Sequence, residues 1–117
     1  MNFFELNGII LNYKLINADS GKPVIAFSNS LGTDFRSWDD CVADLSVDFA
    51  ILLYDKRGHG LSSLGTPPYA IDDHVSDLAG LIDHLSITSA TICGLSVGGL
   101  IAQGLYHKRP NLVNGLI

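Results

Sequence analysis

The chain has 117 residues, of which 47% are hydrophobic and only 16% charged, so its composition excludes a disordered or low-complexity protein. Its formal net charge is -5, and it has no run of lysine or arginine, so we do not expect it to bind nucleic acid. A chain of this length forms at most one domain with a modest hydrophobic core.

Signals for export, membrane insertion or metal binding are absent from the sequence. The first five residues lack the cationic and long apolar regions of a signal peptide, which predicts a cytoplasmic protein. Residues 90–106 are largely apolar, but the stretch is short for a span and contains polar residues, so we exclude a membrane helix. Cys41 and Cys93 fit no metal-ligand spacing and are expected to be small buried residues without a disulfide.

The N-terminal part of the chain predicts a hairpin and two buried strands. Asn7-Gly8 is the strongest short signal for a hairpin turn, and it separates strands expected at 3–6 and 9–16. Continuous apolar runs predict strands at 24–28 and 50–54. We expect both faces of these strands to be covered, because a strand with one exposed face alternates apolar and polar residues.

A helical pattern follows each of these buried strands. Ser37, with Asp40 as its capping-box partner, is expected to begin a helix that runs to about residue 46. Residues 55–70 are rich in glycine and proline, which predicts a loop. The apolar residues after this loop recur at helical spacing: Ile71, Val75, Leu78, Leu81, Ile82 and Leu85.

The C-terminal part repeats the alternation of strand and helix. We expect a strand at 90–93, a helix from Gly98 that Pro110 stops, and a further strand at 112–117. A hairpin followed by alternating strands and helices predicts an α/β fold, with a mostly parallel sheet and helices on both faces. Because the chain ends inside the last expected strand, residues 1–117 are expected to be the N-terminal portion of one longer domain.

The pentapeptide Gly94-Leu95-Ser96-Val97-Gly98 joins an expected strand to an expected helix. In this context G-x-S-x-G predicts a nucleophilic serine, held in a strained turn with its hydroxyl above the sheet. Gly94 and Gly98 are expected where strand and helix pass close together, since a side chain there would clash. The first N–H groups of the helix would face a developing oxyanion. The alternative is a buried serine at a glycine-rich strand end.

Three segments together resemble the N-terminal half of an α/β-hydrolase. Asn29-Ser30-Leu31-Gly32 follows the third strand, where most members carry His-Gly, and Trp38 lies nine residues after Asn29. Residues 54–62, Tyr-Asp-Lys-Arg-Gly-His-Gly-Leu-Ser, are similar to the D-x-R-G-x-G-x-S loop after the fourth strand. Residues 93–101 are similar to the nucleophile elbow. The resemblance implies the α/β-hydrolase fold.

Within this superfamily the segment 27–33 resembles the 3-oxoadipate enol-lactonases, as do the Cys-Gly-Leu-Ser elbow and Ile101-Ala102-Gln103. Val97 departs from the methionine common after the nucleophile, and Ala70 lacks the hydroxyl cap often seen before its helix. Neither departure changes the chemistry, because residue 97 would contribute its backbone N–H. The resemblance implies a serine hydrolase of the β-ketoadipate pathway that opens a small-molecule lactone, 3-oxoadipate enol-lactone, to 3-oxoadipate with no cofactor and no metal.

The resemblance assigns site roles to residues on two loops. Ser96 is the expected nucleophile, and the backbone N–H groups of Leu31 and Val97 are expected to bind the oxyanion. The expected supporting residues are Asn29, Ser30, Gly94 and Gly98.

None of the four histidines is expected to be the general base. The catalytic histidine of this fold follows the serine, whereas His59, His74 and His84 precede it. His107 lies eleven residues after Ser96 on the same helix, which places it about 16 Å along the axis. We therefore expect His107 to be a surface residue, His59 to be structural, and His74 and His84 to be solvated or at the edge of their helix.

Two other side chains are expected to be structural. Asp55 ends a strand at the functional edge of the sheet, where an acid could act. The resemblance instead makes Asp55 a partner that organises the Arg57 loop. Trp38 is expected to pack in the core and not against substrate.

The sequence leaves two classes of function open. In the first, the chain is the N-terminal part of a hydrolase whose acid, histidine and cap lie beyond Ile117, so residues 1–117 alone are inactive. That hydrolase is an enol-lactonase or another α/β-hydrolase, such as a carboxylesterase, a carbon–carbon bond hydrolase or a haloperoxidase-like protein. In the second, the chain is a non-catalytic α/β module, whose last strand pairs with another chain.

Overall fold

A tight turn at Asn7-Gly8 begins the fold. Both residues have positive φ angles, 50° and 82°, and they join strands β1 (Asn2–Leu6) and β2 (Ile9–Ile16) in an antiparallel pair. Asn-Gly is favoured here because a turn with two positive φ angles matches the twist of the flanking strands. The computed structural model, which describes residues 2–117, therefore confirms the predicted hairpin.

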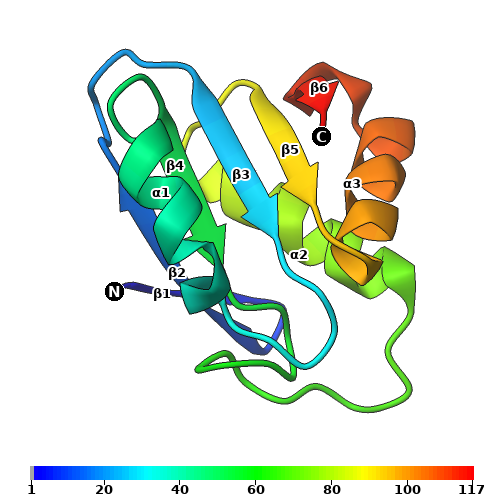
Figure 1. Cartoon of the computed structure of the whole chain (residues 1–117). Coiled ribbons are helices and arrows are strands. Elements are labelled where there is room, and N and C mark those ends of the chain that lie inside the picture. The colour runs from blue at the N-terminus through cyan, green and yellow to red at the C-terminus, as the bar shows by residue number, and fades with distance from the viewer. Residues whose placement is uncertain (1) are drawn as a thin grey trace.

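Within residues 2–117 the hairpin forms the antiparallel side of a six-stranded sheet with the order β1-β2-β4-β3-β5-β6 (Figure 1). The remaining strands are parallel to one another: β3 (Val24–Ser28), β4 (Ala50–Tyr54), β5 (Ala90–Gly94) and β6 (Val113–Leu116). Because parallel strands point the same way, the loops after β3, β4 and β5 meet at one edge of the sheet. The predicted α/β fold is confirmed, and the predicted site residues lie at that edge.

Helices cover both faces of this sheet (Figure 1). Helix α1 (Asp39–Leu45) covers the smaller apolar cluster, which includes Phe27 of β3. Helices α2 (Ile71–His84) and α3 (Val97–Lys108) cover the larger cluster on the other face, which includes the preceding residue Ala26. Successive side chains of a strand point to opposite faces, so the continuous apolar runs supply both clusters. Among the described helices, none has the length and apolar character needed to cross a bilayer.

Helix α3 begins one residue earlier than predicted, at Val97, and two 3₁₀ turns move other element boundaries. Asp34, not Ser37, caps the first helical segment, because its carboxylate accepts a backbone N–H of a 3₁₀ turn (Phe35–Trp38) that precedes α1. Ser37 lies inside this turn and cannot occupy the cap position. A second 3₁₀ turn (Pro110–Leu112) follows α3, so β6 begins one residue later than predicted.

The long loop between β4 and α2 is anchored by a well-shielded ion pair. Arg57 Nε and Nη2 donate to Asp77 Oδ2 and Oδ1 at 2.7 and 2.8 Å. The two side chains are only 16% and 3% exposed, so solvent screens their attraction weakly. This bidentate contact holds the start of the loop against α2.

Helix α3 approaches the ends of β3 and β5 closely at two glycines. A Cβ atom on Gly98 would overlap the backbone carbonyl of Ser28, and one on Gly94 would overlap the backbone carbonyl of Gly98. Backbone atoms cannot move aside as the end of a flexible side chain can. The two glycines therefore lie where the sequence predicts strand and helix to pass close together, and only glycine fits there.

We predict that Gly98→Ala lowers the free energy of unfolding by about 3 kcal/mol, because the added methyl group forces strand and helix apart. Urea unfolding measures this change. Gly99→Ala is the matched control, since its Cβ would come no closer than 3.7 Å to the carbonyl oxygen of Gly94. We expect this control to remain within about 1 kcal/mol of the parent. Equal stability of the two variants would contradict the close-approach argument.

We predict that Asp77→Asn costs about 3 kcal/mol of unfolding free energy, because it leaves the shielded Arg57 guanidinium without its counter-charge. Asp83→Asn is the control, because Asp83 forms an exposed pair with Arg109 at 3.1 Å. Its loss should cost less than about 1 kcal/mol. Thermal or urea unfolding compares the two, and a small cost at both positions would show that the Arg57 pair does not anchor the loop.

Candidate active site

Ser96 lies at the tip of the turn between β5 and α3. Its backbone adopts φ 58° and ψ -118°, a conformation that costs a residue with a side chain about 1–3 kcal/mol. Its carbonyl accepts the N–H of Gly99 at 2.9 Å, so the strained residue leads directly into the helix. Ser96 is exposed at the edge of the sheet where β3, β4 and β5 end. This is the placement that a nucleophile elbow requires.

Several backbone N–H groups at the same edge have no acceptor within residues 2–117, and two of them are the predicted oxyanion donors. These two belong to Val97, the first residue of α3, and to Leu31, in the loop after β3. The two segments adjoin, because Ser28 is the sheet partner of Gly94 and its carbonyl accepts the Leu95 N–H at 3.1 Å. Free donors beside a serine, one at a helix N-terminus, are suited to binding an oxyanion. The sequence-predicted pair is thus brought to the serine's end of the sheet, and its catalytic role stays a prediction.

Side chains and a tight turn shape the loop after β3. The buried Asn29 accepts the Trp38 Nε1–H at 2.8 Å through Oδ1. The carbonyl of Ser30 accepts the Thr33 hydroxyl at 2.9 Å. The Trp38 ring also packs on Phe27 with a centroid distance of 4.7 Å, so it is both a core residue and a hydrogen-bond donor to the loop. These contacts place Asn29 and Ser30 as the loop-shaping residues that the sequence suggests.

Asp55, at the carboxyl end of β4, accepts hydrogen bonds from the surrounding structure at both of its carboxylate oxygens. Its Oδ1 accepts the Phe35 N–H at 2.9 Å, and its Oδ2 accepts Asn12 Nδ2 at 2.9 Å and the Leu61 N–H at 3.0 Å. Asp55 is buried, so these bonds replace water as its partners. It therefore organises the loop that contains Arg57 through backbone donors, while the guanidinium itself pairs with α2.

Lys56 contacts the loop after β3 beside the candidate site, a role that was not predicted from the sequence. Its side chain runs under the loop after β3, where Nζ donates to the carbonyls of Asn29 at 3.1 Å and Ser30 at 3.0 Å. The residue is only 1% exposed. Burial lowers the pKa of the Lys56 ammonium to about 8, and the neighbouring Asp55 carboxylate partly opposes that effect. A lysine directly after a buried strand was the available signal, but the sequence did not indicate its acceptors.

None of the histidines supplies a base to Ser96, whose hydroxyl has no hydrogen-bond partner among residues 2–117. His107 lies near the far end of α3, as expected. His84 is exposed, stacked on Phe4 with a centroid distance of 4.1 Å. The expectation that His74 is solvated is wrong, because it is buried beneath the loop after β4 and burial lowers its pKa.

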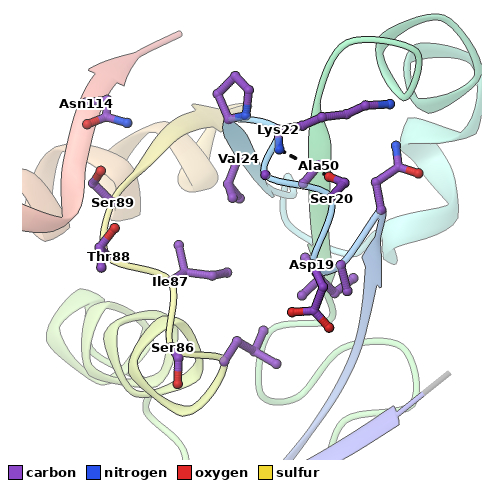
Figure 2. Close-up of a pocket in the computed structure, with 16 residues that line it drawn as sticks. Asp19, Ser20, Lys22, Val24, Ala50, Ser86, Ile87, Thr88, Ser89 and Asn114 are labelled. Carbon is purple, nitrogen blue, oxygen red and sulfur yellow. Dashed lines mark hydrogen bonds between the residues drawn. The ribbon is translucent and has the colours of Figure 1, made fainter.

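Two hollows in the surface lie away from Ser96, which lines neither of them. One of about 370 Å³ lies at the opposite end of the sheet, between the turn at Asp19–Lys22 and the segment 86–89 (Figure 2). The other, of about 390 Å³, lies beside Asp55 and Leu61. Neither includes Ser96 among its lining residues, and residues 2–117 contain no cluster of potential metal ligands. Among residues 2–117, the groups identified at the site are the exposed Ser96 hydroxyl and the backbone N–H groups of Leu31 and Val97.

Comparison with known proteins gives relatives of one fold. A model of the alpha/beta hydrolase fold matches residues 23–117. The chain is 40% identical to 3-oxoadipate enol-lactonase 2 of Acinetobacter baylyi over 109 residues, 93% of the chain and 40% of that protein. It is 31% identical to the putative carbamate hydrolase RutD of Pantoea ananatis, over 90% of the chain and 39% of that protein.

A solved structure shows the same architecture. The crystal structure of the enol-lactonase from Burkholderia xenovorans LB400 matches with a TM-score of 0.93 and 40% identity, over 98% of the chain and 45% of that structure. The chain thus spans about 40% of the length of the curated relatives it matches. With the family model extending over most of its length and the sheet order and elbow in place, this chain belongs to the α/β-hydrolase-fold family.

Proposed function

We propose that Ser96 is the nucleophile of a hydrolase that opens 3-oxoadipate enol-lactone to 3-oxoadipate. The observation that carries this proposal is the exposed serine at φ 58°, with the Leu31 and Val97 N–H groups, unpaired within residues 2–117, at the same sheet edge. The choice of substrate is supported by the names of relatives at 40% identity. The segment 27–33, which replaces the usual His-Gly pattern, supports it as well.

The proposed reaction has two covalent steps. The Ser96 oxygen attacks the lactone carbonyl carbon, and the electron pair of the C=O bond moves to the carbonyl oxygen, where the two N–H groups bind it. The ring C–O bond then breaks, and the enolate oxygen leaves with the electron pair and becomes the ketone after protonation at carbon. Water attacks the acyl-serine, which releases the second carboxylate and restores the serine. Because an enolate is a weaker base than an alkoxide, its departure needs less help from an acid.

The proton of Ser96 must pass to a general base. We propose that residues 1–117 are the N-terminal portion of a hydrolase domain, in which an acid and a histidine that follow in the complete protein supply this base. The position of the serine at an open sheet edge, with no base bonded to it among residues 2–117, supports this arrangement.

A second candidate substrate class is a carbamate. The putative carbamate hydrolase RutD of Pantoea ananatis matches 90% of the chain at 31% identity, so residues 1–117 alone do not distinguish the two carbonyl substrates. A carbamate carbonyl is less electrophilic than an enol-lactone carbonyl, because its nitrogen donates electron density. The two candidates therefore differ in how much activation the site must provide.

We predict that the complete protein hydrolyses 3-oxoadipate enol-lactone with a kcat/KM at least about 100-fold above that for a simple carbamate or a neutral aryl ester, a ratio worth about 2.7 kcal/mol. Steady-state kinetics on the three substrates measures it. A preference for the carbamate would select the second candidate, and a preference for the neutral ester would indicate a general carboxylesterase.

We predict that Ser96→Ala lowers kcat of the complete protein by at least about 10³-fold, because the nucleophile is removed while the fold and the oxyanion donors remain. Ser86→Ala is the matched control, since Ser86 also has a positive φ, 57°, but lies at the opposite end of the sheet. We expect the control to keep its turnover. A folded Ser96→Ala protein with most of its activity would remove Ser96 from the mechanism.

A further inference from the structure

The peptide group between Ser30 and Leu31 is hydrogen-bonded through its carbonyl oxygen, but not through its N–H, within residues 2–117. Its carbonyl oxygen accepts Lys56 Nζ at 3.0 Å and the Thr33 hydroxyl at 2.9 Å. Its N–H, on Leu31, has no acceptor within residues 2–117. A trans peptide is planar, with its C=O and N–H pointing in opposite directions. Any group that fixes this carbonyl therefore also fixes the direction of the Leu31 N–H.

Lys56 is an unusual choice for a purely structural contact. Its ammonium is buried and lies within ion-pair distance of no carboxylate among the described residues, and both its hydrogen bonds go to carbonyls of this loop. Burying a charge without a paired counter-charge is costly. The loop therefore obtains from Lys56 something that an apolar side chain of similar length would not provide.

We propose that Lys56 is a positioning residue for the oxyanion hole, which orients and polarises the Ser30–Leu31 peptide so that the Leu31 N–H binds the oxyanion more strongly. This inference rests on the proposed function of Ser96 and Leu31. A charged donor on the carbonyl oxygen draws electron density through the amide and makes the opposite N–H a better donor. The Thr33 hydroxyl acts on the same oxygen in the same direction but carries no charge.

The effect on catalysis should appear in the transition state and not in substrate binding. The oxyanion forms only after Ser96 attacks, so a weaker Leu31 donor raises the barrier without weakening the ground-state complex. Loss of one oxyanion donor costs about 10²–10³-fold in kcat. Loss of its positioning group should cost a fraction of that.

We predict that Lys56→Met in the complete protein lowers kcat about 10- to 100-fold with KM unchanged within about threefold. It should raise the Kd of phenylboronic acid, whose serine adduct places a tetrahedral oxygen in the hole, by a similar factor. Lys22→Met is the matched control, since Lys22 Nζ also donates to a backbone carbonyl, that of Val47 at 2.9 Å, but at the opposite end of the sheet. We expect the control to change neither quantity.

The outcomes separate this inference from the proposed function. If Ser96→Ala is inactive but Lys56→Met keeps its kcat and its boronic acid affinity, only the inference on Lys56 is overturned. A Lys56→Met protein that is merely less stable, with KM raised and kcat retained, overturns it too. If Ser96→Ala stays active, the proposed function itself fails.

The wild-type protein provides a measurement for the case that Lys56→Met does not fold. The amide nitrogen shift of Leu31 should follow the titration of the Lys56 ammonium, because deprotonation replaces a charged donor on the Ser30 carbonyl by a neutral one. Other charged or titratable groups around Lys56 are Asp55, Arg57 and His59 on its own segment and His74 on α2, so the Lys56 Nζ signal is recorded in the same sample. A Leu31 shift that is insensitive to the Lys56 charge overturns the proposal.

Discussion

The close approach of α3 to the ends of β3 and β5 is the constraint from which the site follows. Gly98 lies against the Ser28 carbonyl, and Gly94 lies against Gly98, so the chain must reverse direction within the few residues between the two glycines. Within that reversal Ser96 takes a positive φ, which presents the serine at the end of the sheet, and Val97 follows as the first residue of the helix. Stability lost in the strained turn is offset by the packing of α3 on the larger core cluster.

Two adjacent residues of opposite charge, Asp55 and Lys56, hold the neighbouring loops by complementary means. The carboxylate of Asp55 accepts backbone N–H groups from the segments on either side of it in the chain, at Phe35 and Leu61. The ammonium of Lys56 donates to carbonyls, those of Asn29 and Ser30. Backbone groups thus supply both partners of Lys56 and, together with the Asn12 side-chain amide, those of Asp55, and both loops become fixed relative to β4. A rigid loop is what lets a backbone N–H act as a catalytic donor without reorganisation.

Features set by local rules could be predicted from the sequence, and features set by tertiary contacts could not. The hairpin at Asn7-Gly8 and the elbow at Gly94–Gly98 depend on which residues tolerate a positive φ or close backbone contact. A short sequence motif is therefore enough to predict each of them. The cap at Asp34 was missed because two oxygen-bearing residues, Asp34 and Ser37, compete to start the same helix. The burial of His74 and the acceptors of Lys56 depend on which loop folds over which side chain, and no local pattern encodes that.

Two exposed leucines belong to the segments that carry the proposed oxyanion donors. Leu31, whose N–H has no acceptor within residues 2–117, is 74% exposed, and Leu95, which precedes the serine, is 54% exposed. A carbonyl substrate attacked by the proposed nucleophile, Ser96, would displace water from around these residues. Removing that water would lower the local dielectric constant, so hydrogen bonds from the proposed donors, Leu31 and Val97, to an oxyanion would be stronger than in solvent. Under the proposed function, the exposed leucines would act on the medium around the Leu31 N–H, whereas the buried lysine would act on that N–H itself.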